Sequence, residues 1–257
     1  EIMRSLNDAK IEARLMFDLI SGSIEEEIAD LFQEFNTLHE WNDITIGVGV
    51  QTINYDILRS VKRGIKVERF VKTFDLLSAR KIFTKIDLII GLPGENFASI
   101  TTTLEYFLEQ LRHSNSHLLC CHVMRGLPGT ELIEQAKKHK MVFSSEREPH
   151  ELIESPILPR KQMLRCLRRT GTVFRLVNHE GWTRRDFLSG STDVQTTLRD
   201  EFFAARDRLG SKNIELVDIL IGKLMRDLSP KSWFVQPDFP YAETWWWGQS
   251  QGEVKDS

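Results

Sequence analysis

The sequence predicts an α/β fold: a partial βα barrel of about four strand–helix units, followed by a helical carboxyl-terminal region. Short apolar runs alternate with amphipathic segments through roughly the first 142 residues. This alternation is typical of βαβ units and of a parallel sheet. Beyond residue 160 only helical spacing of apolar residues remains. Four units are too few to close an eight-stranded barrel, so we expect a partial one.

Four apolar runs are predicted as strands, at residues 11–20, 44–50, 86–90 and 117–124. Helices are predicted between and after them, at 24–38, 56–62, 67–83, from a cap at Asn96 to about 111, and at 131–140. Gly64 is expected to end the short helix 56–62. The third run is almost continuously apolar, which is typical of a strand buried on both faces.

The chain divides into three predicted parts: a partial barrel at 1–142, a helical extension at 143–230, and an aromatic and polar tail at 231–257. Three prolines make 143–160 a predicted loop. The extension should hold helices at 160–178, 195–209 and 213–228. In the tail, Trp245, Trp246 and Trp247 could dock on the domain, on another segment or on a partner, and the sequence leaves these alternatives open.

Composition limits the classes of protein. The chain has 257 residues, of which 41% are hydrophobic and 28% charged. Three cysteines without regular spacing argue against a disulfide framework and for a reducing compartment, so we expect the cytoplasm. No apolar run is long enough to span a membrane. The first residues are helix-like and lack an initiator methionine, so we expect a fragment of a longer protein.

Two similar turns follow the third and fourth predicted strands. One is Gly91-Leu92-Pro93-Gly94 and the other is 126–129, with the same four residue types. Glycine allows a ligand to approach the backbone closely, and ligands of parallel α/β folds bind where the strands end. The same residues would also make ordinary strand-to-helix turns.

Three polar side chains lie at or near predicted strand ends: Gln51, Arg63 and Asp87. Gln51 offers both a donor and an acceptor. Arg63 offers a planar fork that suits a carboxylate, and Asp87 could accept hydrogen bonds from a ribose diol. Each could equally be an ordinary capping, surface or strand-edge residue, so no single one identifies a site.

Together these segments resemble a known family. The run GVGVQTINYDILRSVKRG, then IDLIIGLPGEN, then MRGLPGTEL, is similar to the radical SAM superfamily. It looks most like the cobalamin-binding radical SAM branch and, more distantly, like the oxygen-independent coproporphyrinogen oxidases. The resemblance covers about residues 11–140 and implies strands three to six of a six-stranded partial barrel.

The resemblance implies an enzyme that binds S-adenosylmethionine. Gln51 would contact this cofactor, Arg63 its carboxylate and Asp87 its ribose, with Gly91 and Gly94 at the floor of the site. The backbone from Cys121 would lie near the adenine. A 4Fe-4S cluster, reduced by a cellular electron donor, would pass an electron to the cofactor and cleave it to a 5′-deoxyadenosyl radical, which would abstract hydrogen from a small-molecule substrate.

The chain departs from the family pattern in its cysteines. The three-cysteine loop that would hold the cluster is absent, as is the family's glycine-rich motif, and Gly47 stands where many relatives have a glutamate. Cys120 and Cys121 are adjacent and should face opposite ways, while Cys166 is on a separate helix. The cluster ligands are therefore expected outside this chain, and the segment alone should be inactive. A cobalamin domain could also lie outside it.

Two alternatives remain. The segment 160–185 holds eight lysines and arginines against one acid, which would suit an RNA-modifying radical SAM protein. No aromatic platform is interleaved on this basic face, so a solvated amphipathic helix is favoured and a nucleic-acid partner is not expected. The other alternative is a degenerate, non-catalytic barrel that serves as a binding module.

Overall fold

The computed structural model describes residues 1–19, 24–64, 66–112, 117–144, 150–178 and 194–209, and the single residue 219. The predicted helix at 213–228, the tail at 231–257 and part of the basic segment 160–185 lie outside these residues.

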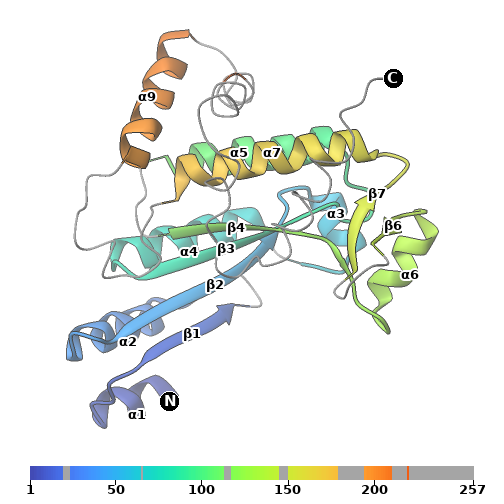
Figure 1. Cartoon of the computed structure of the whole chain (residues 1–257). Helices are drawn as coiled ribbons and strands as arrows, with labels where there is room; N and C mark the ends of the chain where they lie inside the picture. Colours follow the sequence, from blue (N-terminus) through green and yellow to red (C-terminus); the bar gives the residue numbers. More distant parts are fainter. Residues whose placement is uncertain are drawn as a thin grey trace.

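A parallel four-stranded sheet forms the centre of the described chain (Figure 1). Its strands are β1 (Arg14–Leu19), β2 (Asp43–Gln51), β3 (Phe83–Ile90) and β4 (His117–Val123), in the order β1-β2-β3-β4. Every neighbouring pair is parallel. The predicted α/β fold with parallel, adjacent strands is confirmed. Strand β3 begins earlier than predicted, at Phe83, because the preceding helix ends at Ala79.

Helices cover one face of this sheet (Figure 1); one of them precedes β1 and the others connect successive strands. They are α1 (Ile2–Asp8), α2 (Glu26–Leu38), α3 (Tyr55–Ser60), α4 (Val67–Ala79) and α5 (Phe97–Gln110). Alternate residues of β2 from Ile44 to Val50 are fully buried in the core that this layer forms. The rings of Phe70 on α4 and Phe107 on α5 meet edge-on in this core, with centroids 5.7 Å apart.

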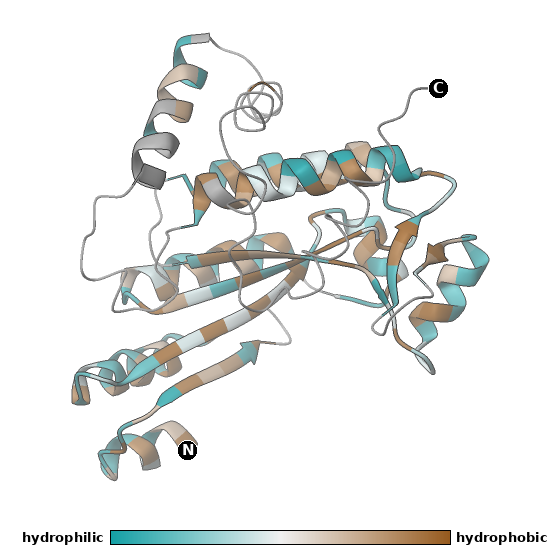
Figure 2. Cartoon of the chain, viewed as in Figure 1, coloured by the Kyte–Doolittle hydropathy of each residue, from teal (hydrophilic) through white to brown (hydrophobic). Residues whose placement is uncertain are grey.

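The opposite, inner face of the sheet carries a buried apolar cluster at one end and a polar, partly open region at the other. On β3 the side chains of Lys85, Asp87 and Ile89 are only half-buried, so the prediction of a strand buried on both faces is wrong. The four strands do not close on themselves, and no strand of the described chain covers this face. Figure 2 shows the alternation of hydrophobic and hydrophilic residues along β2 that results.

One of two predicted helix boundaries is confirmed and the other differs in detail. Asn96 does cap α5, in a capping box where its side chain and that of Ser99 each bond the other's backbone N–H. The short helix α3, however, ends at Ser60, and Lys62 rather than Gly64 takes the left-handed conformation, with φ of 57°. The Arg63 N–H then donates to the Leu58 carbonyl at 2.7 Å, which turns the chain back toward the sheet.

The predicted loop at 143–160 instead contains strands. β5 (Arg125–Gly126), β6 (Val142–Phe143) and β7 (His150–Glu154) form an antiparallel sheet in the order β5-β7-β6, beside helix α6 (Glu131–Lys138). Prolines surround β7 but none lies within it, so its backbone is free to pair. Leu152 at its centre is fully buried in the main core.

Two helices of the predicted carboxyl-terminal region follow. α7 (Arg160–Val177) lies alongside α5, and α9 (Val194–Leu209) contacts α7 (Figure 1). After α7, the Asn178 amide bonds both the N–H and the C=O of Leu119, at 2.7 and 2.9 Å, and so pairs with β4. Side chains on both sides of residue 142 share one core. The domain division at 142 stays a prediction.

Candidate functional site

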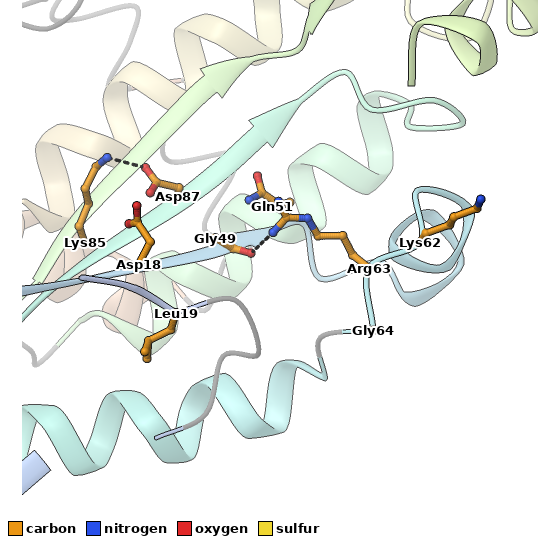
Figure 3. Close-up of a pocket in the computed structure, with 9 residues that line it drawn as sticks. All are labelled: Asp18, Leu19, Gly49, Gln51, Lys62, Arg63, Gly64, Lys85 and Asp87. Carbon is orange, nitrogen blue, oxygen red and sulfur yellow. Dashed lines mark hydrogen bonds and ion pairs between the residues drawn. The ribbon is translucent and has the colours of Figure 1, made fainter. Parts of the chain in front are cut away.

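A cavity of about 520 Å³ opens at the ends of β1 and β2 and beside the middle of β3 (Figure 3). Its volume is within the usual range for a small-molecule site. The residues that line it are Asp18, Leu19, Gly49, Gln51, Lys62, Arg63, Gly64, Lys85 and Asp87. Three residues singled out in the sequence, Gln51, Arg63 and Asp87, therefore come together around one cavity.

The backbone of Gln51 has a conformation that residues with a side chain rarely adopt. Its φ is 68°, in the left-handed region, and it follows an irregularity in the pairing of β2 with β3 between Gly49 and Gln51. The residue is 7% exposed, yet its side-chain oxygen Oε1 is buried without a hydrogen-bond partner among the described residues. Backbone strain together with an unpaired buried acceptor is a pattern that concentrates at ligand sites.

Gly49 lets Gln51 and Arg63 lie against the backbone of β2. An added Cβ at Gly49 would collide with the Gln51 amide and lie 3.2 Å from Arg63 Nη1. Arg63 Nη1 donates to the Gly49 carbonyl at 3.3 Å, which turns the guanidinium toward the sheet (Figure 3). The rest of the guanidinium fork keeps donors for a carboxylate.

Asp87 lies on the inner face of β3 between the side chains of Lys85 and His122. Lys85 Nζ is 3.3 Å and His122 Nε2 is 3.1 Å from its Oδ1 atom. Burial alone would raise the pKa of Asp87, but the His122 hydrogen bond and the charge of Lys85 outweigh burial and lower the pKa. Asp87 is thus an ionised acceptor on the cavity wall.

Sequence reasoning missed three polar residues of this face: Asp18, Lys85 and His122. The Asp18 carboxylate leans over Gly47, where an added Cβ would collide with it. The Asp18 carboxylate thus occupies the space that a side chain at Gly47 would fill. Lys85 had a signal in the sequence, because it and Asp87 are two apart on one strand and must share a face. Asp18 and His122 could be placed only once the strand register was known.

Gly91, Gly94 and Cys121 are not among the residues that line this cavity. Gly91 packs against Leu152 and Met163, and Gly94 faces open space. The expected floor of glycine turns is therefore not found at this cavity. Cys121 points into the core on the helix side, where burial raises the pKa of its thiol well above the usual range. A role for these three residues toward a cofactor stays a prediction.

The cysteines do not converge. Cys120 packs with Phe83 and Leu118 on the inner face, Cys121 belongs to the main core, and Cys166 on α7 is fully buried. Among the residues that the structure describes, no three histidine, cysteine, aspartate or glutamate side chains are grouped to hold a metal ion. Within the same ranges, no helix combines the length and the apolar character needed to cross a membrane.

Part of the basic segment is used inside the protein. The guanidinium groups of Arg165 and Arg169 stack over the Phe97 ring, 4.9 and 4.5 Å from its centre. Arg169 also donates to Thr101 Oγ1 at 2.8 Å and is 4% exposed. Both arginines join α7 to α5; Arg165 stays exposed, whereas Arg169 is buried and already engaged by Phe97 and Thr101.

The described chain thus combines a parallel sheet, helices on one face and a polar cavity beside the strand ends, which is the edge where parallel α/β folds bind their ligands. Residues 1–107 match the family model described as the Radical SAM superfamily. No curated protein matches the chain by sequence.

Parts of several solved structures are similar to this chain at low sequence identity. The radical S-adenosylmethionine methyltransferase TsrM from Kitasatospora setae is 18% identical, with a TM-score of 0.44 over 58% of this chain and 30% of that one. Coproporphyrinogen III oxidase (HemN) from Escherichia coli is 23% identical, with a TM-score of 0.41 over 66% and 34%. Elp3 from Methanocaldococcus infernus is 14% identical, with a TM-score of 0.40 over 69% and 49%. The chain thus spans about a third to a half of these proteins.

Proposed function

We propose that the chain binds S-adenosylmethionine in the cavity lined by Gln51, Arg63 and Asp87, as part of a radical SAM enzyme. The match of residues 1–107 to the Radical SAM superfamily model supports S-adenosylmethionine-dependent radical chemistry. The observation that carries the assignment to this cavity is Gln51 Oε1, a buried acceptor that lacks a partner on a strained backbone. A ligand hydroxyl or amine that donates to this atom would remove the cost of leaving it unpaired.

The other cavity groups fit the same ligand. The Arg63 fork suits the cofactor's carboxylate, the Asp18 carboxylate suits its amino group, and Asp87 suits its ribose hydroxyls. The cavity therefore offers a partner of the right charge for each polar group of a zwitterionic nucleoside. These residues bind and orient the cofactor.

The iron–sulfur cluster does not fit the residues of this chain. The three cysteines lie on different faces and elements, so they cannot supply converging thiolates. We propose that the chain is a fragment and that a 4Fe-4S cluster is bound by residues outside it. With that cluster, bound S-adenosylmethionine supplies the 5′-deoxyadenosyl radical. A small-molecule substrate, a cellular electron donor, a cobalamin domain and a cytoplasmic location remain predictions.

Arg63→Ala in the full-length protein should weaken S-adenosylmethionine binding by roughly ten- to a hundredfold, because a charge-assisted Arg–carboxylate bond contributes about 1.5–3 kcal/mol. Arg63→Lys should restore only part of the affinity, since an ammonium cannot form the same fork. Isothermal titration calorimetry measures all three proteins.

Arg59→Ala is the matched control, because Arg59 is an exposed arginine of α3 that does not line the cavity. It should bind like the wild type. Equal affinity of wild type and Arg63→Ala would remove the basis for placing the cofactor in this cavity.

A further inference from the structure

Both bonding partners of Asp87 contact the same carboxylate oxygen. The shortest contact of Lys85 and the hydrogen bond of His122 are both to Oδ1. No hydrogen bond to Oδ2 is made by the residues that the structure describes. The carboxylate therefore has one oxygen occupied by the protein and one oxygen left for a ligand.

We infer that Lys85 and His122 are positioning residues, which fix the Asp87 carboxylate so that Oδ2 accepts the two hydroxyls of a ribose diol. This inference rests on the proposed function and names the part of the ligand that binds to the inner face. Each carboxylate oxygen has about two acceptor positions. Lys85 and His122 occupy the two acceptor positions of Oδ1. The two acceptor positions of Oδ2 are left, and a vicinal diol has two hydroxyls to donate to them.

The strand register explains why these two residues hold Asp87 firmly. Lys85 and Asp87 are two residues apart on β3, so both face inward. In the pairing of β3 with β4, Asp87 is opposite Cys120 and His122 is opposite Ile89, which places His122 one diagonal step from Asp87 on the same face. Groups fixed by regular strands are oriented more accurately than groups on loops.

Further electrostatic contacts hold Lys85 and His122 beside Asp87. Besides Asp87, Lys85 interacts electrostatically with Asp18, and His122 interacts with Glu151 on β7. The side chains of Lys85, Asp87 and His122 are 28%, 18% and 33% exposed. Their contacts are thus only partly screened by water, while Asp87 stays reachable from the cavity. An ionised Asp87 repels a phosphate, so a free diol is the group accepted here.

The test uses the full-length protein and two ligands, 5′-deoxyadenosine and 2′,5′-dideoxyadenosine, which differ by one ribose hydroxyl. Lys85→Met and His122→Leu each remove one donor from Oδ1, on different strands. Each should weaken binding of S-adenosylmethionine and 5′-deoxyadenosine by about three- to thirtyfold, the effect of one or two misplaced hydrogen bonds. The loss for 2′,5′-dideoxyadenosine should be smaller.

His122→Gln keeps an amide donor and should bind nearly like the wild type. Calorimetry and ligand-observed NMR give the affinities, and circular dichroism confirms that each variant folds. The inference is overturned if Arg63→Ala weakens binding but Lys85→Met and His122→Leu both leave the affinity unchanged. It is also overturned if these two variants weaken the binding of both nucleosides equally. If the wild type does not bind S-adenosylmethionine at all, or Arg63→Ala has no effect, the proposed function itself fails.

Discussion

Gly91→Ala should lower the free energy of unfolding by about 2–5 kcal/mol, whereas Gly94→Ala should lower it by only about 1–2 kcal/mol. The two glycines belong to one turn and have nearly the same φ, 89° and 87°. Alanine is strained at both positions because a Cβ disfavours positive φ. The difference lies in the space around the added methyl group.

At Gly91 an added Cβ would collide with Leu152 and lie 3.1 Å from Met163 Cε, whereas at Gly94 nothing lies within 4 Å. Leu152 and Met163 are fully buried, so neither can move without disturbing the core. Gly94→Ala is therefore a matched control that carries the strain without the collision.

Urea denaturation of the two variants measures the difference in stability. Leu152→Val shortens the colliding side chain, so in combination with Gly91→Ala it should cost less than the sum of the two single changes. Similar stabilities of Gly91→Ala and Gly94→Ala would show that the contact with β7 does not limit this turn.

The arrangement of strands could be predicted because it follows from alternation along the chain. A helix after every strand requires parallel pairing, and the carboxyl ends of parallel strands meet at one edge. Gln51 and Asp87 were placed at a common edge on this ground alone. The backbone conformation of Gln51, and its buried unpaired oxygen, were not visible in the sequence.

The inner face of β3 could not be predicted in the same way. The apolar run at 86–90 is short, and within it the sequence predicts only that Asp87 lies at the start of a strand. The true strand begins at Phe83 and adds Lys85, which extends the polar alternation. Partners across strands depend on register, and one residue of slip would send His122 to the other face. The surroundings of Gly91 could not be predicted for the same reason. They are formed by β7 and α7, and the sequence does not show that these elements pack against the turn.

A second large effect is expected from Glu95, the residue that ends this turn. Its carboxylate accepts hydrogen bonds from the N–H groups of Gly91 at 2.8 Å and Leu92 at 3.3 Å, and it is 2% exposed. Burial raises the pKa of Glu95 from its ordinary 4.5 to about 7, although the hydrogen bonds from Gly91, Leu92 and Thr52 oppose the change. The folded protein therefore holds this proton more tightly than the unfolded chain does.

The sign of the pH dependence follows from that raised pKa. Below pH 4.5 both states are protonated, and between 4.5 and about 7 the folded state binds the extra proton, so stability falls as pH rises through this window. At about 1.4 kcal/mol for each pH unit, the loss amounts to about 3 kcal/mol and then levels off. Glu95→Gln does not titrate, yet its carbonyl oxygen can still accept from Gly91 and Leu92.

The stability of Glu95→Gln minus that of the wild type should therefore rise by about 3 kcal/mol between pH 4.5 and pH 8. Taking the difference removes the contribution of every other titrating group, and its slope does not depend on any constant cost of fitting the amide. Denaturant unfolding of both proteins at five or six pH values gives this curve. Parallel profiles would mean that Glu95 is ionised in the folded state at acidic pH, and that the turn at Gly91 is held by a charged carboxylate.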